Sequence, residues 1–360
     1  MDLLQTYRGR RVIVTGHTGF QGGWLSLWLN ELGAKVTGLA LAPRARPNLF
    51  DALFFAENLD SRFVDVTDGP AVKHIVGAVN ADIVFHLAAQ PIVRQSYANP
   101  IETFATNILG TAHLLEAARA TGSVRAFVSV TTDKVYENRD WLWPYREIDP
   151  LGGLDPYSTS KACAEMISAL YQRNLCRDTI AIATARGGNA VGGGDWSVDR
   201  LVPDIVRAIV SEKPIVLRNP DAVRPWQHVL ELCEGYLQLG AELLNSGRGF
   251  AEAWNFGPHL SELVTVDALT RAMLQLWSCP GHPVEVQASI LPEARILRLD
   301  IAKALARLAW RPRLNVQEAL LWTIRWYQGY YENPSNAYDL TRDQIQCYSR
   351  LMSQTRPARP

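Results

Sequence analysis

Short apolar runs alternate with longer amphipathic stretches over the first half of the chain. Six of these runs are typical of buried parallel strands: 11–15, 35–42, 63–66, 82–90, 126–130 and 179–184. Between them apolar residues recur every three or four positions, which predicts helices that include 24–32, 103–120 and 157–171. This alternation predicts an α/β protein with a doubly wound parallel sheet.

The pattern changes after the sixth predicted strand. Residues 186–196 are rich in glycine, a composition typical of a loop that folds over a ligand. Residues 253–257 predict one more short strand, which returns to the main sheet, and the remainder is mainly helical and rich in tryptophan. The second half of the chain therefore departs from the repeating order of the first.

Composition and charge argue against several classes of protein. The chain has 360 residues, enough for one large domain or two, and its 36 basic residues balance its 36 acidic ones. We therefore expect no nucleic-acid partner and no membrane partner. No apolar run approaches a membrane span, and residues 1–11 lack the apolar core of a signal peptide. The five cysteines are scattered without C-x-x-C pairs, which indicates reduced thiols, a cytoplasmic location and no metal site.

The turn between the first predicted strand and helix carries three glycines at a G-x-x-G-x-x-G spacing: Gly16, Gly19 and Gly22. Strand, glycine turn and helix in this order predict a dinucleotide site, because the backbone can approach a pyrophosphate at the helix N-terminus. Phe20 and Gln21 lie inside this turn and belong to the predicted cofactor site. The alternative is a purely structural turn.

Other strand ends bear on the choice of dinucleotide. The ribose-binding acid usual after the second strand is missing, and Arg44 and Arg46 stand there instead. An acidic residue at this position favours NAD, whereas an arginine can accommodate the ribose phosphate of NADP. The alternative is that the loop with these two arginines is only a solvated basic loop. Asp65, in the third predicted strand, is placed to meet the adenine. Ala88 and Ala89, at the end of the fourth, are small enough for a cofactor to approach closely.

Two further groups of residues suggest proton transfer. Tyr157 and Lys161 are four residues apart and share one helix face. The pKa of a phenol in water is about 10, and a nearby ammonium favours the phenolate, which can then take a proton from a sugar hydroxyl. Thr132, Asp133 and Lys134 lie at the C-terminal end of the fifth strand, the edge where functional groups of open α/β sheets gather. An ordinary Tyr and Lys on a solvated helix face are the alternative.

Arginines that follow the glycine-rich loop suit a diphosphate. The planar guanidinium pairs with two oxygens at once, which favours this role for Arg200 and Arg224. Arg218 is better interpreted as a surface arginine. His86 lies inside an apolar run and is expected to be a core histidine rather than a catalyst.

The glycine turn, Asp65, Ala88, Ala89 and the Tyr157/Lys161 pair together resemble the extended short-chain dehydrogenase/reductases, the NAD-dependent epimerase/dehydratase family. Longer blocks resemble the CDP-glucose 4,6-dehydratase branch of that family: 16–20, 132–134, 152–158, 192–196, 224–229 and 254–258. The resemblance extends over nearly the whole chain.

This resemblance implies a Rossmann domain, residues 1–189 with 226–257, that holds NAD tightly. A smaller, mainly helical C-terminal domain, residues 190–225 with 258–345, would hold the nucleotide sugar, and residues 346–360 would form a tail. The substrate-binding residues that it implies are Arg94, Asn189, Arg200, Arg224 and His228.

The implied reaction converts CDP-D-glucose to CDP-4-keto-6-deoxy-D-glucose, a precursor of deoxysugars such as those of lipopolysaccharide O-antigen. A hydride leaves C4, water is lost across C5 and C6, and the hydride returns to C6. Tyr157 would deprotonate the C4 hydroxyl, Thr132 would donate to that oxygen and Lys161 would lower the phenol pKa. Asp133 would protonate the departing C6 hydroxyl. Lys134 replaces a glutamate of related dehydratases and is either the base for the C5 proton or an electrostatic support.

Alternative functions remain open on the same fold. A nucleotide-sugar epimerase or reductase would need Tyr157 and Lys161 but no acid at position 133, and a dehydratase could act on another nucleotide sugar. A cofactor-binding protein without turnover would need no proton relay. One face of the helix expected over 103–120 suits a second subunit, so we expect a homodimer or homotetramer.

Overall fold

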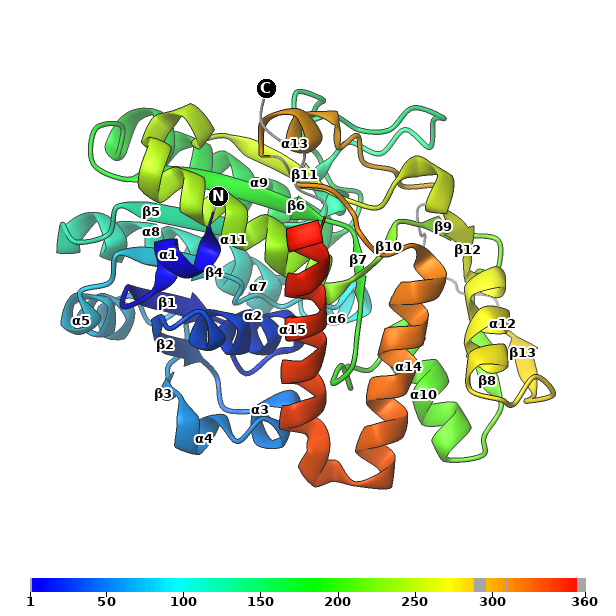
Figure 1. The fold of residues 1–360 in the computed structure, drawn as a ribbon. Coiled ribbons are helices and arrows are strands. Elements are labelled where there is room, and N and C mark those ends of the chain that lie inside the picture. Colours follow the sequence, from blue (N-terminus) through cyan, green and yellow to red (C-terminus); the bar gives the residue numbers. More distant parts are fainter. Residues whose placement is uncertain (1, 288–295, 309, 355–360) are drawn as a thin grey trace.

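The computed structural model describes residues 2–287, 296–308 and 310–354. Its centre is a seven-stranded sheet with the order β11-β6-β5-β4-β1-β2-β3, in which every neighbouring pair is parallel (Figure 1). The strands are β1 Arg11–Thr15, β2 Lys35–Ala40, β3 Asp60–Phe63, β4 Ile83–His86, β5 Ala126–Val130, β6 Ala181–Gly187 and β11 Ala253–Phe256. The strand order reverses between β1 and β4, so the predicted doubly wound sheet is confirmed, as is the return of the late strand to it.

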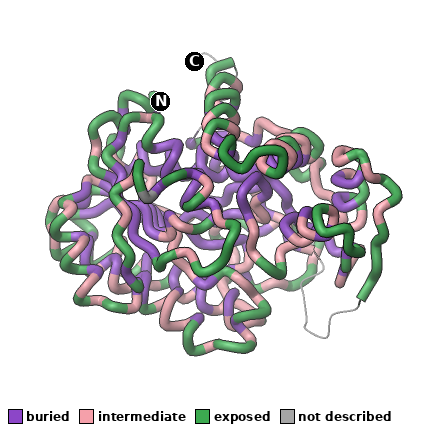
Figure 2. The backbone as a smooth tube through the Cα atoms, turned by 90° about the horizontal axis from the view of Figure 1, so that it is seen from below, coloured by how far each residue is buried: buried purple, intermediate pink, exposed green. Residues whose placement is uncertain are grey.

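Helices cover both faces of the sheet, which explains why its strands are apolar on both sides. On one face α2 and α11 pack together, with α1 and α15 beyond them; on the other lie α5, α8 and α9. The tube in Figure 2 shows the resulting buried interior between exposed outer segments. The bounds are α1 Leu3–Tyr7, α2 Phe20–Glu31, α5 Gly69–Val79, α8 Gly110–Thr121, α9 Pro156–Leu170 and α11 Val229–Ser246.

Several predicted elements differ from the observed ones. The fourth strand, expected over 82–90, ends at His86, so Ala88 and Ala89 lie beyond it. The third strand is Asp60–Phe63, not 63–66, so Asp65 lies in the turn that follows it. Val64 and Val66 are buried beyond the end of the strand, where the Val64 backbone nitrogen still donates to the Ala40 carbonyl oxygen at 2.9 Å, and their burial produced the apolar signal. The helix expected over 103–120 is composed of α7 Pro100–Phe104, a π-helical turn Ala105–Leu109, and α8.

The C-terminal half adds a smaller, mainly helical region. In the described residues it also contains three two-stranded pairs, β10-β7, β12-β9 and β13-β8. The strands are β7 Asn189–Val191, β8 Ile215–Leu217, β9 Val223–Arg224, β10 Trp226–His228, β12 Val264–Thr265 and β13 Val284–Val286. The helices are α10 Leu201–Val210, α12 Val266–Leu276, α13 Ala302–Arg307, α14 Val316–Glu332 and α15 Ala337–Gln354. Short helices α3 Leu49–Ala52, α4 Phe55–Asn58 and α6 Val93–Ala98 complete the larger half.

The last helix extends into the segment that was expected to form a tail. Residues 346–354, expected as part of a tail, belong to α15, which runs beside α14 and packs on α2 (Figure 1). The ring of Tyr348 is fully buried against Trp28, which explains why the helix continues. The rest of the expected tail, 355–360, lies outside the described residues.

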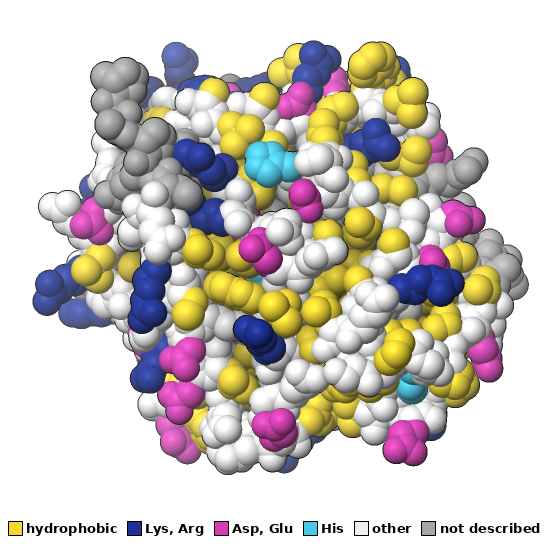
Figure 3. Space-filling model, turned by 45° about the vertical axis from the view of Figure 1, so that its right-hand side comes forward, with side chains coloured by type: hydrophobic (Ala, Val, Ile, Leu, Met, Phe, Trp, Pro, Cys, Tyr) yellow, Lys and Arg dark blue, Asp and Glu magenta, His cyan; other side chains and the backbone are white. Residues whose placement is uncertain are grey.

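Basic and acidic side chains are interspersed on the face drawn in Figure 3 rather than gathered by sign. No helix among the described segments has the length and apolar character that a membrane crossing requires.

Candidate active site

The glycine turn brings the ends of β1 and β4 into close contact. Gly16 has a φ of 76°, and a Cβ atom there would lie 2.9 Å from the backbone nitrogen of Ala88. A Cβ at Gly22 would lie 2.1 Å from the Gly16 carbonyl oxygen, so only glycine fits both positions. Gly19 is the N-cap of α2 and presents no side chain there. The turn therefore leaves backbone N–H groups at the start of α2 close to the strand switch point, as a pyrophosphate site requires.

Residues expected near the rest of the dinucleotide lie along the same edge. The Asp65 carboxylate accepts hydrogen bonds from the backbone nitrogen and hydroxyl of Thr67, at 2.9 and 2.8 Å. Arg46 is exposed and lies 3.3 Å from Asp51. These contacts do not distinguish an NAD site from an NADP site.

His17 is a residue of this turn that the sequence patterns did not single out. Its buried ring covers Gly38, where a Cβ atom would lie 2.3 Å from the ring, and its Nε2 is 3.1 Å from the Ser61 hydroxyl. It therefore links the glycine turn to β2 and β3. His86 is the core histidine that the sequence predicts, because it is buried and hydrogen-bonded to Thr15 and Thr111.

A short 3₁₀ helix at the end of β5 carries the first group of candidate catalytic residues. Thr132 is its N-cap, and its hydroxyl lies 3.0 Å from Asp133 Oδ1. Lys134 Nζ donates to the same oxygen at 3.1 Å. Asp133 is fully buried, and within the described residues its second oxygen, Oδ2, has no hydrogen-bond partner. A buried carboxylate oxygen without a partner is costly, which makes it a candidate for contact with a reacting group.

The second group lies in the first turns of α9, which begins with Asp155 as N-cap and Pro156 at its first position. Tyr157 and Lys161 are both buried. Burial raises the pKa of the Tyr157 phenol to about 12; the hydrogen bond from Thr132 opposes this rise, the charge of Asp133 adds to it and the charge of Arg200 opposes it. Thr132 and Asp133 thus lie within interaction range of Tyr157.

The surroundings of Lys161 bear on the role expected for it. Lys161 Nζ donates to the Val130 carbonyl oxygen at 2.9 Å, and burial lowers its pKa to about 8 against the opposing charge of Glu165. The pKa of the Tyr157 phenol is raised because desolvation outweighs the Thr132 hydrogen bond and the charge of Arg200, which oppose the rise. A lowering of this pKa by Lys161 stays a prediction.

The predicted substrate-binding residues lie in different environments. Arg200 is close enough to Tyr157 for each charge to affect the other's pKa, and it donates to Asp195 at 2.8 Å. Asn189 opens β7, and in the described structure its buried Oδ1 accepts no hydrogen bond. Arg224, in β9, is nearly buried and donates to the Val223 carbonyl oxygen.

Arg94 and Arg218 meet at one carboxylate, Asp199. Their nearest guanidinium nitrogens lie 3.3 and 2.5 Å from its Oδ1. Arg218, expected to be a surface residue, is therefore part of an ion-pair cluster that joins α6 to the end of β8. The sequence does not single out Asp199 as the common partner of Arg94 and Arg218, because the three residues are too far apart in the chain for a spacing rule to relate them.

His228, the last of the predicted substrate-binding residues, is buried among aromatic rings. It is the N-cap of α11, where its Nδ1 accepts from the Leu230 backbone nitrogen, and its ring packs against Trp24 and Trp322. The side chain is fully buried, as that of Asp133 is. Its Nε2 has no hydrogen-bond partner among the described residues, so its part in substrate binding stays a prediction.

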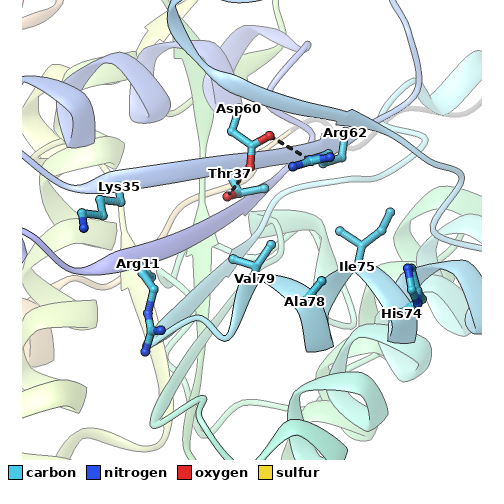
Figure 4. Close-up of a pocket in the computed structure, with 9 residues that line it drawn as sticks. All are labelled: Arg11, Lys35, Thr37, Asp60, Arg62, His74, Ile75, Ala78 and Val79. Atoms are coloured by element: carbon cyan, nitrogen blue, oxygen red, sulfur yellow. Dashed lines mark hydrogen bonds and ion pairs between the residues drawn. The ribbon is translucent and has the colours of Figure 1, made fainter.

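A pocket of about 340 Å³ lies away from all these residues (Figure 4). Arg11, Lys35 and Asp60, which line it, are the first residues of β1, β2 and β3, so the pocket is at the opposite edge of the sheet. In the close-up the Arg62 guanidinium forms an ion pair with the Asp60 carboxylate. The catalytic candidates and this pocket are thus separated by the length of the strands.

Comparisons with known proteins agree with this geometry. The family model described as GDP-mannose 4,6 dehydratase matches residues 13–321. CDP-glucose 4,6-dehydratase of Salmonella typhimurium is 42% identical over 330 residues, which cover 90% of this chain and 92% of the relative. dTDP-glucose 4,6-dehydratase of Streptomyces antibioticus is 31% identical over 88% of this chain and 92% of its own. Among solved structures, dTDP-glucose 4,6-dehydratase of Streptomyces venezuelae with NAD and TYD bound has a TM-score of 0.76 at 28% identity, and the match covers 92% of this chain and 99% of that one.

Proposed function

Because the chain belongs to the GDP-mannose 4,6-dehydratase family, we propose that it is an NAD-dependent hydro-lyase that converts CDP-glucose to CDP-4-keto-6-deoxyglucose. The observation that carries this proposal is the 42% identity to a CDP-glucose 4,6-dehydratase over nearly the full length of both chains. The site supports it, because Asp133 lies beside Thr132 and Tyr157, where an acid is needed for dehydration and not for epimerisation.

The residues of the glycine turn fit a dinucleotide. Gly16 and Gly22 leave no room for side chains, and the N-terminus of α2 provides N–H groups for a pyrophosphate. Bound NAD would accept the hydride from C4 and return it to C6. Relatives solved with NAD bound support NAD over NADP, despite the arginines at positions 44 and 46.

The chain's own residues would manage the protons. Tyr157 takes the proton of the C4 hydroxyl, and Thr132 donates a hydrogen bond to that oxygen. Asp133 gives a proton to the C6 hydroxyl as it leaves. Lys134, held 3.1 Å from Asp133, either removes the C5 proton or stabilises the charge that develops on the sugar. Arg94, Asn189, Arg200 and Arg224 are proposed to contact the nucleotide sugar.

Purified protein mixed with CDP-glucose, and with no cofactor added, tests the proposal. We expect a 4-keto product with the mass of the substrate minus water, formed faster from CDP-glucose than from UDP-glucose or dTDP-glucose. An isomer of unchanged mass would indicate an epimerase. A preference for dTDP-glucose would overturn the assignment of cytosine as the nucleobase of the substrate.

We expect the protein to purify with NAD bound, because a cofactor regenerated in each turnover has no need to dissociate. Denaturation followed by chromatography of the released nucleotide identifies it. Recovery of NADP would show instead that Arg44 or Arg46 binds a ribose phosphate.

An exposed apolar surface supports a homodimer, from which a homotetramer could be built. Ile101, Leu109, Met166 and Leu170 are 76, 54, 56 and 50% exposed, on the mutually packed segments α7, the π turn and α9. Isolated exposed apolar residues are ordinary, but a group on adjacent helices is typical of an interface.

The variant Met166→Glu/Leu170→Glu should therefore be monomeric in sedimentation experiments, since it places two charges on this surface. Leu260→Glu, at a residue that is 49% exposed in the C-terminal region, is the matched control and should leave the oligomer intact. A dimer that persists in the double variant would exclude this surface.

The cysteines support the proposed cytoplasmic location. Cys163, Cys176, Cys233, Cys279 and Cys347 are all free thiols, as is usual in a reducing compartment.

A further inference from the structure

A buried carboxylate lies between the two groups of candidate catalytic residues. Glu165 is 4% exposed and accepts four hydrogen bonds. Two come from hydroxyls, Thr131 Oγ1 at 2.5 Å and Thr184 Oγ1 at 2.6 Å. The other two come from Arg186, Nε at 3.0 Å and Nη2 at 2.9 Å, in a bidentate pair. Burial acts to raise the pKa of Glu165, but Arg186 and the hydroxyls outweigh it and hold the pKa below its ordinary value.

Arg186 extends the network beyond its carboxylate partner. Its Nη1 donates to the Tyr136 hydroxyl at 2.8 Å and to the Glu147 carbonyl oxygen at 3.3 Å. The Tyr136 hydroxyl donates in turn to Asn255 Oδ1 at 2.6 Å, which connects the pair to β11. Arg186 is itself 3% exposed, so both charges are removed from solvent.

These contacts surround the residues proposed to carry the reaction. Thr131 and Tyr136 stand on either side of the segment 132–135, so both ends of that segment are tied to the Glu165–Arg186 pair. On α9, Tyr157, Lys161 and Glu165 follow at intervals of four and lie on one face. The pair therefore fixes the segment that carries Thr132 and Asp133 against the helix that carries Tyr157 and Lys161.

Resting on the function proposed above, we infer that Glu165 and Arg186 are positioning residues for the reaction. They do not touch the substrate; they hold the acid at 133 and the base at 157 in the mutual geometry that C4 oxidation and water loss require. A buried ion pair is poor evidence for added stability, because desolvation offsets much of its attraction, whereas a fixed arrangement of its neighbours is a known use. Loss of the pair should therefore affect turnover and have little effect on nucleotide-sugar affinity.

The test is the double variant Glu165→Gln/Arg186→Gln, which removes both charges and leaves no lone buried ion. Its matched control is Glu234→Gln/Arg313→Gln, at another buried bidentate pair, which joins α11 to residues before α14. For both variants we would measure the melting temperature, the affinity for CDP by calorimetry, and the turnover of CDP-glucose. The rate at which bound cofactor becomes reduced in a single turnover isolates C4 oxidation.

We expect the Glu165/Arg186 variant to lose about 100-fold in kcat and in the rate of cofactor reduction, since displacements of about 1 Å at reacting groups have effects of this size. Its affinity for CDP should stay within about threefold of wild type, because the network lies outside the proposed nucleotide contacts. The control should keep its kcat. Equal kcat values in the two variants would show that the pair is only structural and would overturn the inference.

A milder change keeps the test valid if the double variant does not fold. Thr131→Val removes one hydroxyl contact to Glu165 and retains the ion pair and the shape of the side chain. We expect a loss of about tenfold in kcat, a small fall in the melting temperature from the lost hydrogen bond, and an unchanged affinity for CDP. Wild-type kcat in this variant would contradict the positioning role. Absence of turnover in the wild-type protein would contradict the proposed function instead.

Discussion

Replacement of Tyr157 by Phe is expected to lower kcat by about 100- to 10,000-fold, the usual contribution of a positioned acid–base group. The substitution keeps the ring, which is buried in the first turn of α9, and removes only the hydroxyl. Cofactor should therefore remain bound in the purified variant. Steady-state formation of the 4-keto product measures the loss.

The environment of the phenol adds a pH dependence to this expectation. Burial raises the pKa of Tyr157 to about 12, so the phenol of the free protein is protonated at neutral pH. Raising the pH therefore increases the phenolate fraction, and kcat/KM, which reports the groups of the free enzyme, should rise with pH in the wild type through this group. Burial lowers the pKa of Lys161 to about 8, so the same rise in pH removes a cation from the site and opposes the gain.

Tyr171→Phe is the control for this substitution. Tyr171 follows α9, and its hydroxyl donates to Glu116, away from the candidate site. This variant should turn over CDP-glucose as the wild type does. A Tyr157→Phe protein with wild-type kcat would remove Tyr157 from the mechanism.

Asp133→Asn is expected to separate the first step of the reaction from the second. The substitution keeps the size of the side chain but cannot supply an acidic proton to the C6 hydroxyl, so water loss should slow by about 100- to 10,000-fold. Oxidation at C4 requires Tyr157 rather than Asp133. The variant should therefore develop the absorbance of the reduced cofactor on addition of CDP-glucose and keep it.

The surroundings of Asp133 make this variant informative. Its Oδ1 is held by Thr132 and Lys134, while Oδ2 is buried and has no hydrogen-bond partner among the described residues. Asp60→Asn, at the opposite edge of the sheet, is the control and should leave turnover unchanged. Normal dehydration by Asp133→Asn would exclude Asp133 as the acid.

Lys134→Ala distinguishes the two roles left open for that residue. If Lys134 removes the C5 proton, the variant should stall at the same stage and solvent deuterium should not enter C5. If it supports charge only, C5 should still exchange while water loss is slow. Its side chain is 29% exposed, so burial does not decide between the two roles.

The fold was predictable because its strands are short apolar runs separated by amphipathic helices. The boundary errors have physical causes: Val64 and Val66 are buried beyond the end of β3, and apolar content alone does not distinguish burial from pairing. The resemblance implied a tail beyond residue 345, yet the chain continues there as a helix that the buried ring of Tyr348 anchors.

The candidate site was predictable only where its residues are close in sequence. Tyr157 and Lys161 share a helix face, and Thr132 and Asp133 share a strand end, so local geometry places them. The contact of Thr131 with Glu165 spans 34 residues and that of Arg94 with Asp199 spans 105, and no spacing rule relates such pairs. The burial of His228 between two tryptophans likewise depends on tertiary packing.

In the proposed reaction, one bound cofactor would carry a hydride from C4 to C6 of the same sugar as water is lost. CDP-glucose labelled with deuterium at C4 tests it most directly, with purified protein and no added cofactor. We predict a 4-keto-6-deoxy product, lighter than the substrate by one water, with the deuterium at C6 by NMR. Deuterium retained at C4 in a product of unchanged mass, or lost to solvent, would contradict it.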